Sequence, residues 1–66
     1  MDSVSLHLRV TGHRLRTAPG LDAATREDIV YVTARAGMAL DLAHLAAARR
    51  ELERLETIAR RCGVEP

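Results

Sequence analysis

The chain has few of the residues that small proteins use to reinforce a limited core. Cys62 is the only cysteine among 66 residues, so no intramolecular disulfide can form. One cysteine and three scattered histidines lack the paired spacing of zinc ligands, and we expect neither a metal nor another cofactor. Aromatic residues are almost absent, since the chain has one Tyr and no Trp or Phe. Lysine is missing too. The ten arginines and the many alanines are typical of a protein from a GC-rich bacterial genome. Arginine content alone is therefore weak evidence for nucleic-acid binding.

Long apolar runs and catalytic motifs are also missing. No stretch approaches the roughly 18–20 apolar residues that a membrane span requires. The start Met1-Asp2-Ser3 is not a basic region leading into an apolar one, as a signal peptide would have. We therefore expect a cytoplasmic protein, in which a lone thiol stays reduced. Because there is no glycine-rich phosphate loop, nucleophile elbow or pair of catalytic carboxylates, we expect no enzyme.

What is present fits one folded domain over residues 1–66. Hydrophobic residues make up 47% of the chain and charged residues 29%, with a formal net charge of +1. This composition is typical of a globular protein. A chain of this length hides only about 60% of the surface that its unfolded form exposes, which leaves it marginally stable. Association with another chain is the remaining way to add stability.

The first 17 residues alternate in the manner of a half-buried strand. Val4, Leu6, Leu8 and Val10 fall on one side, and polar residues fall on the other. The glycine at position 12 suits a turn, and residues 14–17 can return as a partner strand. The pattern predicts a β-hairpin over residues 1–17, ended by the proline and glycine at 19–20.

A first helix is predicted over residues 25–36, with Thr25 as N-cap and Gly37 as the C-terminal stop. Its apolar stripe consists of Ile29, Val32, Ala36 and Leu40. The β-branched and aromatic run at 29–33 is also the composition of a buried strand, so residues 28–33 stay open between the two, with helix favoured.

The most regular segment is a long helix predicted over residues 41–62, which Asp41 can cap and Gly63 can close. Six of its residues are separated by 3, 4, 3, 4 and 3 positions and form a coiled-coil-like a/d seam: Leu45, Ala48, Leu52, Leu55, Ala59 and Cys62. The seam could pack only on the first helix of its own chain. A first helix of some 11 residues is too short, however, to cover a seam of about 22 residues, which is roughly 33 Å long. We therefore expect these six residues to form an oligomer interface.

An antiparallel homodimer is the favoured arrangement of this seam. It sets Arg49 opposite Glu56, whereas a parallel pair sets Glu51 against Glu56. Its layers also match in size, with leucine meeting leucine and alanine meeting alanine. The expected assembly is a helical bundle in which the two first helices flank the two long ones.

The predicted hairpin carries basic side chains that could bind an anionic partner: His7, Arg9, Arg14 and Arg16. An ordinary solvated face is the alternative, and the hairpin has no aromatic residue to stack on bases. A helix-turn-helix around Gly37 is disfavoured, because glutamates in the last helix would repel phosphate. Asp41 and His44 could exchange a proton but more often form a surface contact, and Tyr31 is expected to fill a core or an interface.

These observations predict an α-dominated α+β fold with an N-terminal β-hairpin followed by a two-helix hairpin. The expected function is that of a non-catalytic bacterial adaptor or regulatory subunit that homo-oligomerises through its last helix and binds a larger protein. The alternative is a small dimeric DNA-binding regulator, for instance an antitoxin-like repressor, that uses the basic residues near the N-terminus.

Overall fold

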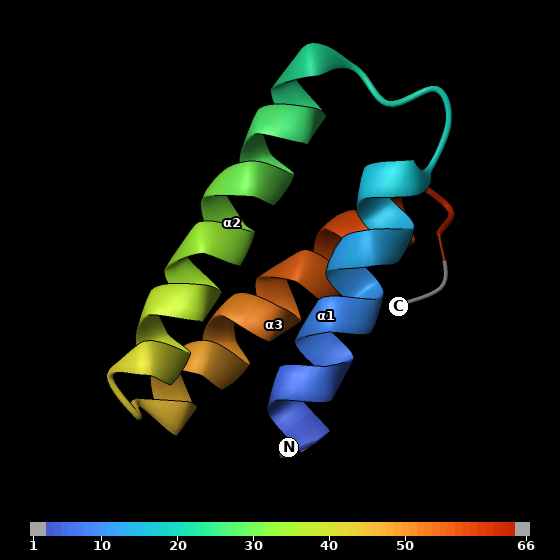
Figure 1. Cartoon of the computed structure of the whole chain (residues 1–66). Helices are drawn as coiled ribbons and strands as arrows, with labels where there is room; N and C mark the ends of the chain where they lie inside the picture. The colour runs from blue at the N-terminus through green and yellow to red at the C-terminus, as the bar shows by residue number, and fades with distance from the viewer. Residues whose placement is uncertain (1–2, 65–66) are drawn as a thin grey trace.

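Three helices and two short connections make up residues 3–64, which are the residues that the structure, a computed structural model, describes (Figure 1). Helix α1 spans Ser3–Thr17, α2 spans Ala23–Asp41 and α3 spans Leu45–Arg61. The three run up, down and up beside one another, and α2 and α3 share the most extensive interface (Figure 1). The protein is therefore an all-helical three-helix bundle, and no strand occurs within residues 3–64.

The predicted β-hairpin over residues 1–17 is wrong, because Ser3–Thr17 forms α1, and Met1 and Asp2 lie outside the described residues. Val4, Leu8, Thr11 and Leu15 are spaced by 4, 3 and 4 residues, so a helix places them on one face, and that face is turned into the bundle. Two strands alone are only marginally stable in water, whereas this helix covers an apolar face of α3. Leu6, one of the alternating residues that suggested a strand, lies on the outer side of the helix and is 54% exposed.

Helix α2 is longer than the predicted helix at both ends. Its N-cap is Asp22 rather than Thr25, and the Asp22 carboxylate accepts a hydrogen bond of 2.8 Å from the Thr25 backbone N–H. Gly37 does not stop the helix, which continues to Asp41. Residues 28–33 are helical in spite of their β-branched run, because Ile29 and Val32 then face the core together.

The turn between α2 and α3 takes residues 42–44. Ala43 adopts a left-handed conformation with φ of 58°, and its N–H reaches the Leu40 carbonyl at 3.0 Å, while the His44 N–H reaches the Ala39 carbonyl at 2.8 Å. His44, not Asp41, occupies the N-cap position of α3, and its side chain makes no capping hydrogen bond. The last helix therefore begins four residues later than predicted.

One apolar core joins the three helices. All three helices contribute buried residues to it: Leu8 and Leu15 from α1, Ile29, Val32 and Ala36 from α2, and Leu52, Leu55 and Ala59 from α3. The predicted stripe of α2 contributes three of these core residues, and its fourth member, Leu40, packs against them while partly buried.

Gly12 lies where α1 packs tightly against α2. It is buried inside α1 rather than placed in a turn, and a Cβ atom added to it would lie 3.2 Å from the Cγ2 atom of Thr33. A side chain at position 12 would therefore push the two helices apart.

Candidate functional site

The seam of α3 packs inside its own chain. Ala48, Leu52, Leu55 and Ala59 are all buried against α1 and α2. Only the ends of the seam reach the surface, since Leu45 is 48% exposed and Cys62 is partly buried. One short helix would be too short to cover the seam, but α1 is a second helix that covers it beside α2. A dimer through these residues would require the bundle to open.

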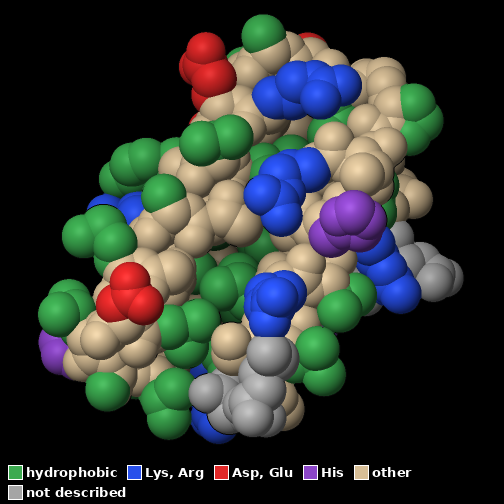
Figure 2. Space-filling view, viewed as in Figure 1, with side chains coloured by type: hydrophobic (Ala, Val, Ile, Leu, Met, Phe, Trp, Pro, Cys, Tyr) green, Lys and Arg blue, Asp and Glu red, His purple; other side chains and the backbone are tan. Residues whose placement is uncertain are grey.

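The four basic candidates lie on α1 and are all exposed. Their spacing places them in two rows, because residues seven apart lie one above the other on a helix. His7 and Arg14 form one row and Arg9 and Arg16 form the other, with Leu6 between them on the outer face. Figure 2 shows basic side chains over the part of the molecule that α1 occupies in Figure 1. They surround α1 rather than forming one flat face.

The outer face of α2 carries most of the large apolar side chains that the bundle leaves exposed. Val30, Met38 and Leu42 are each 63% exposed, and Tyr31 is 59% exposed. Hydrophobic side chains follow the outer edge of α2 along the left of the space-filling view (Figure 2). Exposed apolar residues are ordinary when they are scattered, but a contiguous group marks an interaction site. We call this surface the outer face of α2 and define it by Val30, Tyr31, Ala34, Met38 and Leu42.

The outer face is shallow rather than a deep pocket. Its most apolar hollow is open to solvent and is lined by the two residues Val30 and Tyr31 together with Ala34, Arg26 and Glu27. Small ligands are usually held in concave sites that bury most of their surface. A broad and open apolar strip along a helix suits the side of another protein better than a small molecule.

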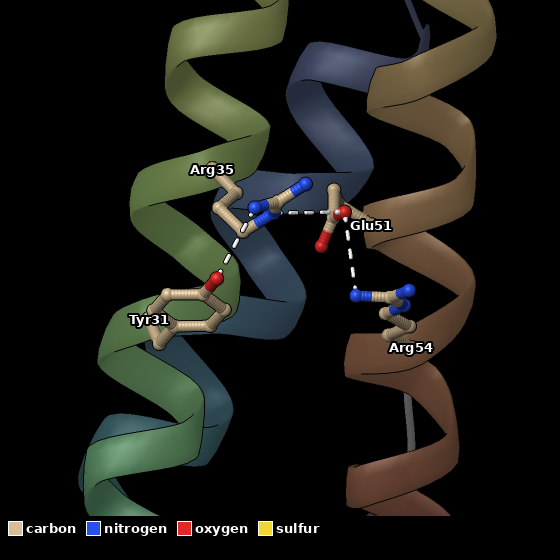
Figure 3. A network of polar contacts seen from close by, with 4 residues as sticks. All are labelled: Tyr31, Arg35, Glu51 and Arg54. Carbon is tan, nitrogen blue, oxygen red and sulfur yellow. Dashed lines mark hydrogen bonds and ion pairs between the residues drawn. The ribbon is translucent and has the colours of Figure 1, made fainter.

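A polar network fixes Tyr31 at the edge of this face (Figure 3). The Arg35 guanidinium donates from Nη1 to the Tyr31 hydroxyl at 3.1 Å and from Nε to the Glu51 Oε1 atom at 3.3 Å. Its Cζ atom also lies 5.5 Å from the centre of the Tyr31 ring. These contacts raise the pKa of Arg35 above its ordinary value, first through the Tyr31 hydroxyl and then through the Glu51 carboxylate.

Glu51 anchors the network on α3. Its side chain is only 8% exposed, and its Oε1 atom also lies 3.6 Å from Nη1 of Arg54. The other carboxylate oxygen, Oε2, is buried and has no hydrogen-bond partner within residues 3–64. Glu51 therefore fixes the position of the Arg35 guanidinium from α3, while the hydrogen-bonding capacity of its own Oε2 atom stays unsatisfied.

Sequence reasoning missed the outer face of α2. It assigned Tyr31 to a core or an interface and did not select Val30, Ala34 or Met38. These three residues follow one another at four-residue intervals, a second apolar row beside the stripe that faces the core. A helix with apolar residues on both faces is the signal that could have found this site.

Two further findings bear on chemistry. Within residues 3–64, no group of three or more His, Cys, Asp or Glu side chains comes close enough to hold a metal ion. None of the three described helices is long and apolar enough to cross a membrane.

Comparison of the chain with protein-family models, curated proteins and solved structures finds no match.

Proposed function

We propose that the protein is a non-catalytic interaction module that binds another protein through the outer face of α2. One observation carries this proposal: Val30, Tyr31 and Met38 lie on the exposed side of α2 and Leu42 follows at its C-cap, each about three-fifths exposed. Removing apolar surface from water contributes roughly 25 cal/mol per Å². Burial of this row by a partner would stabilise the complex by that free energy, which the isolated bundle does not obtain because the row stays in water.

The network around Tyr31 supports the same proposal. Tyrosine and arginine are enriched among the residues that dominate binding energies at protein interfaces. Arg35 and Glu51 already hold the Tyr31 side chain in one orientation. A side chain that is ordered before binding loses less conformational entropy when a partner covers it.

A second candidate is an anionic partner, including nucleic acid, bound by α1. Residues 3–17 contain three arginines and two histidines and no acidic residue, which favours contact with negative charge. Binding through several arginines weakens steeply as salt rises, whereas binding through the outer face of α2 does not. A DNA titration at two salt concentrations tests this candidate, and the absence of binding at low salt rules it out.

The location that we propose is the cytoplasm. The unpaired Cys62 supports it, because thiols remain reduced there.

A photo-crosslinking experiment in the source cell tests the main proposal. A photoreactive phenylalanine analogue replaces Met38 on the outer face of α2, and in a matched control it replaces Arg50, which is exposed on α3. We expect a discrete adduct from position 38 and none from position 50. No adduct from position 38, or equal adducts from both positions, would contradict an interface on this face. Mass spectrometry of the adduct identifies what was bound.

A further inference from the structure

The exposed side of α2 contains a heptad-like seam of its own. Six residues are separated by 3, 4, 3, 4 and 3 positions, and all six are exposed: Ala24, Glu27, Tyr31, Ala34, Met38 and Asp41. This spacing is that of the a and d positions through which helices pack side by side. The seam of α3 has the same spacing and is covered by its own chain, whereas the seam of α2 has no covering helix in the bundle.

We propose that a second copy of this chain covers the outer face of α2, with the two α2 helices packed antiparallel. This inference rests on the proposed function and names the partner that the outer face binds. Three features of α2 support this dimer: the charges along its seam, the pair of charges beside the seam, and a glycine that the single bundle does not require.

The charges along the seam favour the antiparallel arrangement. In a parallel pair each residue meets its own equivalent, so Glu27 would face the partner's Glu27 and Asp41 the partner's Asp41. In an antiparallel pair the a positions meet the d positions of the partner. Tyr31 then lies over the partner's Ala34, and Met38 lies over the methylene groups of the partner's Glu27. Large residues meet small or flexible ones, and the two direct contacts between like charges disappear.

The residues beside the seam add an attraction. In the same antiparallel register, Arg35 and the partner's Asp28 occupy facing e positions. The symmetry of the dimer repeats this pair, so the interface contains it twice. Both residues are exposed in the single bundle, where Arg35 also contacts Tyr31 and Glu51 of its own chain. Opposite charges at such positions set orientation more than affinity.

Gly37 supplies the third feature. It lies in the interior of α2, where glycine is less favourable than alanine, yet a Cβ atom added to it would contact nothing within 4 Å. The single bundle therefore gives no packing reason for a glycine at this position. In the antiparallel pair the partner's Val30 faces Gly37 across the g positions, and the missing side chain leaves space for it.

The dimer is expected to be weak and reversible. The contact is one helix pair along the 19 residues of α2, which are about 28 Å long. Such a contact belongs to the small interfaces of transient complexes. We expect association to be visible when the protein concentration is raised from about 10 μM to about 1 mM.

Sedimentation equilibrium over this concentration range tests the dimer. We expect a species of twice 7.3 kDa to grow with concentration. Gly37→Ala should raise the midpoint of thermal unfolding of dilute protein, because alanine favours the helix, and weaken dimerisation by about tenfold or more, because two added methyl groups overpack the contact. These opposite shifts distinguish an interface from a general loss of stability. Met38→Glu should abolish the dimer at unchanged helicity, and Arg50→Glu on α3 should leave it intact.

Cysteine cross-linking tests the orientation. Two single-cysteine proteins are made in a Cys62→Ser background, one with Glu27→Cys and one with Met38→Cys, both at exposed positions. The antiparallel register brings position 27 next to the partner's position 38. We expect the mixture to form disulfide-linked dimers under mild oxidant much faster than either protein alone. Faster linkage of each protein with itself would show a parallel pair and overturn the proposed arrangement.

The two proposals fail in different ways. A single subunit at every concentration, together with a photo-adduct from position 38 to a different protein, overturns the homodimer and leaves the interaction face intact. A single subunit with no adduct from position 38 overturns both. A photo-adduct of twice the chain mass, with weaker association of Gly37→Ala, supports both.

Discussion

Replacing Gly12 with alanine should destabilise the protein even though alanine is the better helix former. Alanine contributes about 1 kcal/mol over glycine within a helix. Its Cβ atom, however, would lie 3.2 Å from the Cγ2 atom of Thr33, while carbon atoms in contact normally lie about 3.5–4.0 Å apart. Either Thr33 turns away or α1 and α2 separate.

Thr33 cannot easily turn away. Its β-branched side chain has few rotamers in a helix, and its hydroxyl donates to the Ile29 and Val30 carbonyls of the preceding turn. Overpacking of this kind costs about 1–3 kcal/mol. This cost exceeds the gain in helix propensity from glycine to alanine. We therefore expect Gly12→Ala to lower the free energy of unfolding by about 1 kcal/mol, which lowers the unfolding midpoint of a domain of this size by about 4–8 °C.

A double-mutant cycle measured by circular dichroism isolates the cause. Thr33→Ser removes the Cγ2 methyl group and keeps the hydroxyl. In that background Gly12→Ala should become stabilising by about 1 kcal/mol, so the coupling between the two sites is about 2 kcal/mol. Gly37→Ala, with open space around its Cβ position, is the matched control and should stabilise dilute protein by about 0.5–1 kcal/mol. If Gly12→Ala stabilises the protein as much as Gly37→Ala does, the packing argument is refuted.

Four further predictions test other parts of the bundle. Glu51→Met should leave the free energy of unfolding unchanged or raise it. Glu51→Gln should lower it by about 1–3 kcal/mol, because it buries an amide N–H group without an acceptor. A Met variant that is less stable in urea titrations would contradict this. Asp22 has a pKa below its ordinary value because it accepts hydrogen bonds at the start of α2, so its contribution to stability is present at neutral pH and disappears as the pH falls below about 4. Asp22→Ala should therefore flatten the acid limb of the curve of unfolding midpoint against pH, and an unchanged limb would exclude the cap as its cause. Leu55→Ala removes a fully buried side chain and should cost about 2–5 kcal/mol in thermal unfolding, against less than about 1 kcal/mol for the half-exposed Leu45→Ala. Ala43→Gly should raise the unfolding midpoint, because glycine adopts the left-handed conformation of this residue without strain, and a lowered midpoint would refute that reasoning.

The last helix is the part of the fold that could be read most directly from the sequence. Its apolar residues repeat over five intervals, and a pattern of that length fits a helix and no strand. Ala48, Leu52, Leu55 and Ala59 are buried in α3, as an apolar seam requires. What covers the seam could not be read in the same way, since burial against the same chain and burial against a second chain produce the same pattern.

The candidate site was less accessible to sequence reasoning than the core. The stripe of α2 that contains Ile29 and Val32 was identified, but the row that contains Val30 and Met38 was not. Both rows are apolar, and only the packing of α2 against α3 decides which of them becomes the core and which remains exposed. The exposed row becomes visible as a site only after that choice.

The sequence alone sufficed to predict an amphipathic helix over residues 41–62, because the repeat there is long and residues of high helix propensity fill it, and the structure places that helix at Leu45–Arg61. The state of residues 3–17 depended on the tertiary structure, because the apolar residues at 4–10 fit a period of two, whereas Val4, Leu8 and Leu15, with the buried Thr11, fit a helical period. A short segment with two readings adopts the one that buries more apolar surface against its neighbours. Here that neighbour is the seam of α3, which α1 can cover as a helix but not as an isolated hairpin.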